Sequence, residues 1–114
     1  MISGIGSSLA GLFAFGSKLS VAAHNVANVN TDGYRKTTAT IAEGKKGLPV
    51  VVYGKPNTPP QVIREPDGVT GERSNVELSE EFTRMMISLR GYEANIKTLK
   101  TEVEMVGTLI DIIW

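Results

Sequence analysis

The sequence contains no cysteine, so neither a disulfide nor a reactive thiolate can contribute to its fold or its chemistry. A single histidine, His24, rules out a metal site built from several histidines and leaves any catalytic triad dependent on one residue. Twelve basic residues balance twelve acidic ones, and this zero net charge argues against a nucleic-acid partner. The sequence therefore predicts no catalytic residues, no metal site and no cofactor.

The sequence also lacks a long uninterrupted apolar run. Its N-terminal stretch is apolar, but no basic residue precedes Lys18, and glycines and serines recur throughout it. These features predict neither a cleavable signal peptide nor stable insertion into a membrane.

Residues 74–114 carry a sustained hydrophobic repeat with spacings that alternate between four and three, which is typical of a coiled-coil helix. Such a helix would be about 55 Å long, too long for one small domain to cover, so it needs a partner helix. Ser74 followed by Glu77 predicts a capping box at its start. The predicted stripe consists of Leu78, Phe82, Met85, Leu89, Tyr92, Ile96, Leu99, Val103, Val106 and Ile110.

A second, shorter heptad stripe occupies residues 1–34, although each interior glycine costs a helix about 1 kcal/mol relative to alanine. This combination indicates either a close approach between helices or a segment that orders only among its partners. Pairing of the two stripes, within one chain or between chains, buries both. The sequence thus predicts a mainly α fold of long paired terminal helices forming a coiled coil. The N-terminal stripe consists of Ile5, Leu9, Leu12, Leu19 and Val26.

The middle of the chain, residues 35–73, has a different composition and contains all five prolines. Before it, Asn25, Asn28 and Thr31 with Gly33 predict a helix stop and a turn. Short β-branched runs at 48–53 and 61–64 predict a small β-hairpin or extended excursion, with loops at 54–60 and 65–73.

Two groups of residues resemble the bacterial flagellar axial proteins of the rod and hook. The segment from residue 25 to 35 is similar to that family's signature of asparagines, threonine, glycine, aromatic and basic residues, and residues 74–112 are similar to its closing helix. The short middle segment resembles the proximal rod proteins most. The residues that carry the resemblance include Asn25, Asn28, Thr31, Gly33, Tyr34, Asn75 and Asn95.

The resemblance implies a non-enzymatic structural subunit of the flagellar basal-body rod, required for motility. It further implies export through the flagellar type III apparatus without a cleavable signal peptide, and assembly in the periplasm with other rod subunits and further copies of itself. The two heptad stripes would be its assembly seam. The alternative is a soluble coiled-coil adaptor or export chaperone that binds other flagellar or type III substrates through the same stripes.

Overall fold

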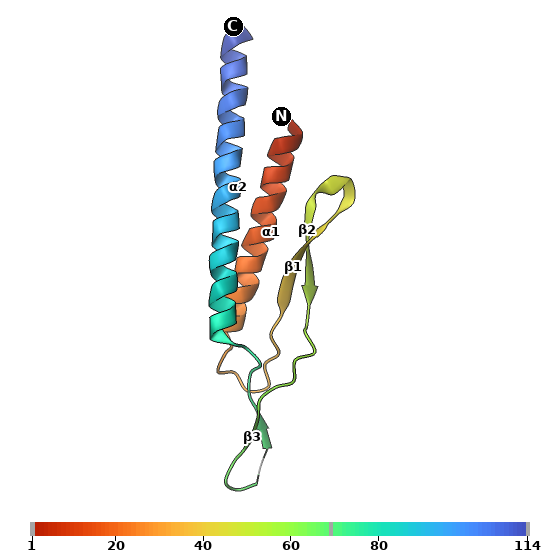
Figure 1. Cartoon of the computed structure of the whole chain (residues 1–114), viewed down its shortest axis with the longest axis vertical. Coiled ribbons are helices and arrows are strands. Elements are labelled where there is room, and N and C mark those ends of the chain that lie inside the picture. Colours follow the sequence, from red (N-terminus) through yellow and green to blue (C-terminus); the bar gives the residue numbers. More distant parts are fainter. Residues whose placement is uncertain (1, 69, 114) are drawn as a thin grey trace.

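The structure, a computed structural model, describes residues 2–68 and 70–113 as two long antiparallel helices with two small β-hairpins between them in the sequence (Figure 1). The helices are α1 (Ile2–Ala27) and α2 (Leu78–Ile113), and a short 3-10 turn lies at Lys45–Gly47. The strands are β1 (Thr38–Glu43), β2 (Pro49–Gly54), β3 (Val62–Arg64) and β4 (Thr70–Glu72). The predicted paired terminal helices are therefore present.

The molecule is long and thin, measuring 80 × 24 × 14 Å. Its radius of gyration is 20.1 Å, whereas a compact chain of this length would have a value of about 13 Å. The shortest dimension is little more than the diameter of one helix, about 10 to 12 Å. Such a shape has no room for an interior layer of large side chains.

Small residues bring the two helices close together. A Cβ atom at Gly11 would overlap the Asn95 amide group, and one at Gly91 would overlap the Phe15 ring. This geometry supports close approach between helices, which was the first of the two explanations for the glycines in the N-terminal helix.

The start of α2 differs from the prediction. The helix begins at Leu78, and the Ser74 hydroxyl accepts a hydrogen bond of 3.3 Å from the Val76 N–H before the helix starts. The Glu77 carbonyl accepts the first helical bond, 3.1 Å from the Glu81 N–H, so the predicted capping box is wrong. Ser74 is instead buried in the connection that leads into the helix.

The excursion contains two hairpins, whereas the sequence predicted a single small one. Strands β2 and β3 lie where the two β-branched runs predicted them, but they do not pair with each other. Instead β2 pairs antiparallel with β1, and β3 with β4. The missed partners fall in weak strand sequence, since β1 mixes threonine with alanine and β4 is Thr-Gly-Glu. The prediction of a loop across 65–73 was therefore wrong for residues 70–72, and Val69 lies outside the described residues.

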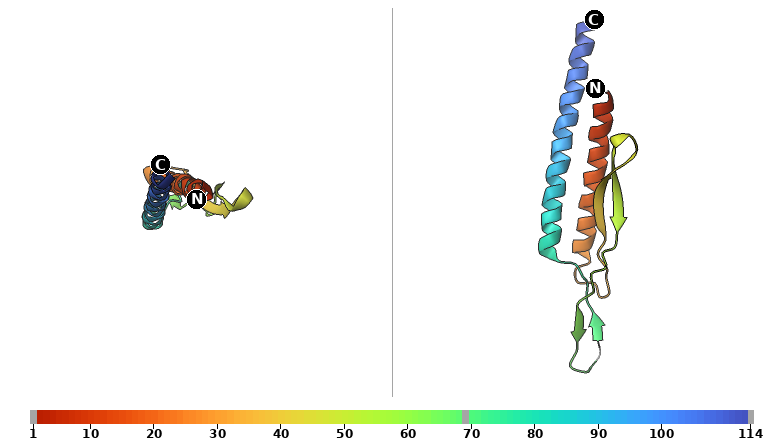
Figure 2. Two further views of the ribbon diagram at one scale, coloured as in Figure 1. Left: turned by 90° about the horizontal axis from the view of Figure 1, so that it is seen from above. Right: turned by 45° about the vertical axis from the view of Figure 1, so that its right-hand side comes forward.

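The two hairpins occupy different places on the molecule. The β1–β2 hairpin runs beside α1, while β3–β4 extends beyond the turn end of the helix pair (Figure 2). Positive backbone φ angles close both turns, at Lys46 and Gly47 in the first and at Gly68 in the second. In this arrangement α1 lies between α2 and the β1–β2 hairpin.

We expect Gly91→Ala to destabilise the helix pair by about 1 to 3 kcal/mol, because the added methyl group meets the Phe15 ring. The matched variant Gly107→Ala lies on the same helix with nothing within 4 Å, and should stabilise the helix by about 0.5 to 1 kcal/mol. Urea unfolding followed by circular dichroism measures both changes. Equal effects from the two substitutions would contradict close packing at Gly91.

Candidate functional site

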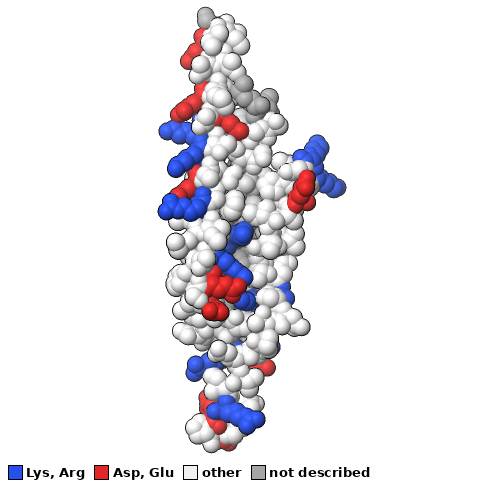
Figure 3. All heavy atoms as spheres, in the orientation of Figure 1, with Lys and Arg blue, Asp and Glu red and all other residues white. Residues whose placement is uncertain are grey.

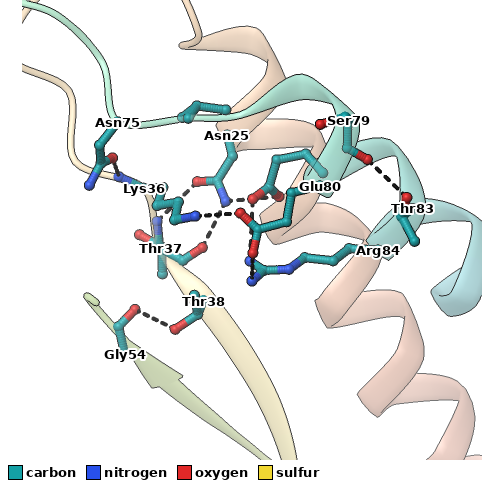
Figure 4. Close-up of polar contacts among 12 residues, drawn as sticks. Asn25, Lys36, Thr37, Thr38, Gly54, Asn75, Ser79, Glu80, Thr83 and Arg84 are labelled. Carbon is teal, nitrogen blue, oxygen red and sulfur yellow. Dashed lines mark hydrogen bonds and ion pairs between the residues drawn. The ribbon is translucent and has the colours of Figure 1, made fainter. Parts of the chain in front are cut away.

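Asn25, near the end of α1, is the centre of a buried polar junction between the two helices and the first hairpin (Figure 4). Its side-chain nitrogen donates to the Thr37 carbonyl at 2.7 Å and to a Glu81 carboxylate oxygen at 3.1 Å. Its side-chain oxygen accepts from the Thr37 N–H and from the Tyr34 hydroxyl, each at 3.0 Å. One amide therefore ties α1, the strand entry and α2 together.

Glu81 is as fully buried as Asn25, with 0% of its surface exposed. Besides the Asn25 amide, the Arg84 guanidinium one turn along α2 donates to its carboxylate at 3.3 Å. A buried carboxylate is costly without such donors, so the junction depends on both partners being present. Burial, together with the nearby Glu81 charge, raises the pKa of the Tyr34 phenol, whose hydroxyl donates to Asn25.

Glu80 forms a second, more exposed part of the same junction. The Lys36 ammonium, itself largely buried, donates to one of its carboxylate oxygens at 2.6 Å, and Arg84 donates to the other. The Lys36 hydrogen bond and the two positive charges hold the pKa of the Glu80 carboxyl below its ordinary value of 4.5. These ion pairs anchor the start of α2 to the segment that enters β1.

The other signature residues hold the backbone around this junction. The Asn28 amide donates to the His24 carbonyl at 2.9 Å and accepts from the Thr31 hydroxyl at 3.2 Å, which closes the helix end. Gly33 adopts a positive φ of 69°, and its N–H donates to the Glu72 carbonyl at 2.8 Å.

Asn75 and Asn95 act at two other positions. The Asn75 side chain accepts from the Lys36 N–H at 2.6 Å and donates to the Thr58 carbonyl at 3.1 Å, which fixes the approach to α2. Asn95 lies in the middle of the helix pair against Gly11, and its amide donates to the Gly91 carbonyl at 2.8 Å. The signature residues thus fall mainly at the turn end of the molecule, with Asn95 the exception.

The predicted stripe on α2 is divided between two environments. Met85, Tyr92, Leu99 and Val106, which are seven residues apart, are half-buried, and the Tyr92 ring lies against Gly16 of α1. The alternate members, together with the first residue of the helix, are exposed: Leu78, Phe82, Leu89, Ile96, Val103 and Ile110. Each of these exposed side chains keeps between 40% and 57% of its surface accessible. We call the five from Phe82 to Ile110 at seven-residue intervals the exposed α2 stripe.

The predicted stripe on α1 is likewise only partly covered. Ile5, Leu12, Leu19 and Val26 are half-buried, while Leu9 is exposed. The most enclosed positions of the helix pair instead belong to polar and small residues that the heptad pattern did not select. They are Ser8, Gly11, Ala14, Ala22 and Asn25 on α1, and Glu81 and Ser88 on α2.

The distribution of burial is the reverse of that in an ordinary globular domain. Among the described residues, the buried hydrophobic side chains are only Ala14 and Ala22, whereas nineteen large hydrophobic side chains are exposed. The accessible surface is 8122 Å², and a compact protein of this mass would expose about 6,100 Å². The excess, about 2,000 Å², is comparable with the area that a subunit buries in an obligate assembly.

The charged residues occupy only part of the surface. In the view of Figure 3 they gather along the outer edge of α2, around the junction and at the two hairpin tips, with uncharged surface between. Among residues 2–68 and 70–113, no three histidine, aspartate or glutamate side chains lie together in a way that could hold a metal ion. In the same part of the chain, one helix, Ser3–Ala27, is long and apolar enough to cross a membrane by length and composition alone.

Two segments of the chain match known protein families. Residues 7–35 match the family described as flagella basal body rod protein, and residues 70–112 match the family described as flagellar basal body rod FlgEFG protein C-terminal. The first segment contains Asn25 and the second contains Glu81, so each family contributes one partner of the buried junction contact. Residues 36–69, with β1, β2 and β3, lie outside both matches.

Similar proteins of known name include flagellar hook and rod proteins. The chain is 39% identical over 41 residues to the flagellar hook protein FlgE of Escherichia coli, covering 36% of this chain and 10% of that protein. It is 38% identical over 53 residues to the flagellar basal-body rod protein FlgG of Bacillus subtilis, covering 40% of this chain and 20% of that protein. The hook protein of Borreliella burgdorferi is 41% identical over 39 residues, covering 34% of this chain and 9% of that protein. The matched part therefore spans between about a tenth and a fifth of these relatives.

We expect Asn25→Ala to destabilise the protein by about 2 to 4 kcal/mol, because it removes a donor from the buried Glu81 carboxylate and leaves the Thr37 N–H without its acceptor. Asn28→Ala removes the same functional group from a more exposed position and should cost about 1 kcal/mol or less. Chemical unfolding of the two variants beside the unsubstituted chain measures the difference. Similar losses of stability for both variants would show that burial of the Asn25 hydrogen bonds does not increase their contribution.

We expect the Glu80 ion pairs to stabilise the protein at neutral pH and to fail in acid. Because the folded-state pKa of Glu80 is depressed, its contribution is complete above the ordinary value of 4.5 and is lost as the pH falls through the lower folded-state value. Glu80→Gln should therefore lower the thermal unfolding midpoint at neutral pH, and the difference should shrink below about pH 4. A difference that is independent of pH would argue against these ion pairs.

Proposed function

Because this chain belongs to the family of bacterial flagellar rod and hook proteins, as its two motif regions predicted, we propose that it is a structural subunit of the flagellar basal-body rod. The family is structural and not enzymatic. The particular resemblance to proximal rod proteins stays a prediction, since the relatives described above are hook proteins and a FlgG rod protein.

The observation that carries the proposal is the exposed α2 stripe. Phe82, Leu89, Ile96, Val103 and Ile110 recur every seven residues along the helix, and each is about half exposed. A heptad stripe is the surface with which one helix packs against another, and α1 covers only its neighbouring positions. The stripe therefore has the form of a seam that a helix from another subunit would cover.

In this proposal, assembly buries what the single chain leaves exposed. Complete burial of one large apolar side chain is worth about 1.5 to 3 kcal/mol, so covering the remaining half of five of them would contribute about 5 kcal/mol. That gain is set against the entropy lost on association, which it must exceed together with other contacts. The subunits would then pack through their terminal helices as coiled coils, with other rod subunits and further copies of this chain as partners.

The proposal also includes the route by which the chain reaches the rod. It is exported by the flagellar type III apparatus without a cleavable signal peptide, and assembles in the periplasm. The polar interface between α1 and α2 supports this route, because a helix pair with few large buried apolar side chains is easily unfolded for transport.

An adaptor or export chaperone would also use exposed apolar stripes, and this is the second candidate function. It would keep the chain in the cytoplasm and outside the rod. The two functions differ in what a cell loses when the gene is removed, and the following experiment separates them.

We expect cells that lack this gene to be non-motile, with basal-body rings but no rod in electron micrographs, and the unsubstituted gene to restore both rod and swimming. Ile96→Asp, which places a charge on the exposed α2 stripe, should fail to restore either, because the charge would be buried between subunits. Thr101→Asp adds the same charge at an exposed position on another side of α2 and should restore both. Circular dichroism of the purified variants checks that each retains its helices.

Three outcomes would contradict parts of this account. Intact rods in the deletion strain would exclude an essential rod role. Deletion cells with rods, but with other export substrates lost, would favour the adaptor. Normal rods with Ile96→Asp would exclude the exposed α2 stripe as the assembly seam.

A further inference from the structure

Strand β1 has a paired edge and a free edge, because the β1–β2 hairpin is a sheet of only two strands. At the closed end of the hairpin, the Gly44 N–H donates to the Leu48 carbonyl at 2.8 Å. Hydrogen-bonded pairs alternate along an antiparallel ladder, so the even-numbered residues of β1 bond to β2. The odd-numbered residues therefore direct their backbone N–H and C=O groups to the free edge.

The Asn25 side chain already occupies the first position of this free edge. It donates to the Thr37 carbonyl at 2.7 Å and accepts from the Thr37 N–H at 3.0 Å. These are the two hydrogen bonds that a residue of an adjacent antiparallel strand would form with Thr37. The next outward residue is Ala39, and no hydrogen bond reaches its backbone from that side within residues 2–68 and 70–113. The edge is therefore closed at Thr37 and open from Ala39 onward.

A pocket of about 270 Å³ lies beside this edge, between β1 and α2. Residues 37–40 form its β1 wall, and Val21 and Ala22 line it from α1. Ser88 and Arg84 line it from α2, and in Figure 4 the Arg84 side chain extends toward the entry of β1. Successive side chains of a strand point to opposite faces, so four consecutive residues share one pocket only along their edge. The unpaired backbone of β1 therefore faces a space that a second strand could enter.

The pocket suits an extended chain and not a helix. A helix is about 10 to 12 Å across with its side chains, so a space of about 270 Å³ would hold less than one turn. A strand added to β1 would lie about 4.8 Å from it and would pair with the outward backbone groups. Beyond the pocket the same edge continues through Ile41 to Glu43. The open edge can therefore pair with a short extended segment.

The free edge of β2 is less suited to such pairing. One of its outward residues is Pro49, which has no N–H to donate. Proline on an edge strand opposes the addition of a further strand. None of the residues that line the pocket belongs to β2. The β1 edge is therefore the one at which the hairpin can accept another strand.

Lys18 gives the pocket a positive charge that has no partner. The side chain is half-buried and lines the pocket from α1. The other cation of the pocket, Arg84, is paired with both Glu80 and Glu81. Lys18, in contrast, forms no ion pair within residues 2–68 and 70–113. An acidic side chain on an incoming segment would supply the missing partner, in a charge-assisted hydrogen bond.

We propose that the open edge of β1 binds an extended, acidic segment of another protein chain. The segment adds a third strand to the β1–β2 hairpin, and one of its carboxylates pairs with Lys18. Backbone hydrogen bonds at the edge supply affinity, while Lys18 and the small apolar side chains of α1 select the sequence. This site is separate from the exposed α2 stripe, so it does not depend on the proposed rod role.

Peptide selection tests the proposal without a known partner. A library of random eight-residue peptides displayed on phage is selected on the immobilised full-length chain. We expect the enriched peptides to contain aspartate or glutamate between β-branched residues. Binding of the corresponding synthetic peptides, measured by fluorescence anisotropy, should slow amide hydrogen exchange at Ala39 about tenfold or more.

Two proline substitutions separate the open edge from the rest of the hairpin. Ala39→Pro removes an outward N–H without removing a hydrogen bond between β1 and β2, and should weaken peptide binding about tenfold. The matched variant Tyr53→Pro removes the outward N–H of the register partner on β2, and should change binding less than about twofold. Circular dichroism checks that both variants keep their helices.

A charge reversal tests the selectivity without altering the backbone. Lys18→Glu should weaken binding of the acidic peptides about tenfold or more, because it replaces an attraction with a repulsion. The same peptides with each acidic residue replaced by lysine should bind this variant better than they bind the unsubstituted chain. Lys18→Gln should have a smaller effect than Lys18→Glu.

Each of the other outcomes overturns the proposal. A selection that enriches no peptide, or equal effects of the two proline substitutions, would exclude the β1 edge as a strand-binding site. Binding that Lys18→Glu leaves unchanged would exclude the acidic partner. Displacement of the peptides by acetate at the same concentration would assign the pocket to a small anion. Self-association that Ala39→Pro abolishes, without peptide binding, would make a second copy of this chain the occupant.

Discussion

The structure depends on one buried contact, the hydrogen bond between the Asn25 amide and the Glu81 carboxylate. It joins the end of α1 to the beginning of α2 at the point where the chain has completed its excursion of two hairpins. Both groups are fully buried, so a shift of either helix along its axis would break this hydrogen bond and leave Arg84 as the remaining donor to the Glu81 carboxylate. The contact therefore helps to fix the register of the helix pair.

A polar interface inside the chain has a consequence for the surface outside it. Small and polar residues occupy the line along which α1 and α2 meet, so the large apolar residues of the heptad repeats are displaced to its edges. Folding of the single chain therefore buries little apolar surface. The free energy of burying the exposed apolar side chains is still available to stabilise an association. This is the physical basis of the proposed role in the rod.

The division of the α2 stripe explains how one helix can serve two partners. Residues 85, 92, 99 and 106 are half-buried, while residues 82, 89, 96, 103 and 110 are exposed. A heptad repeat places its apolar residues in two adjacent rows along the helix. One row can pack against a helix of the same chain while the other stays available for a second helix. The exposed α2 stripe thus leaves a row of apolar side chains on the same helix for the partner subunit proposed above.

The sequence by itself determined the two helices, the turn after α1, the positions of two of the four strands and the flagellar family, because periodicity, turn residues and signature motifs are local properties. It did not reveal Glu81, Ser88 or Lys36 as buried residues, nor the partners of β2 and β3. Those features arise from contacts between segments far apart in the chain. Only the tertiary structure decided which row of each heptad stripe is covered. Glycines at the interface and the Asn25–Glu81 hydrogen bond set the rotation and register of the two helices. The spacing of apolar residues in the sequence contains no information on either.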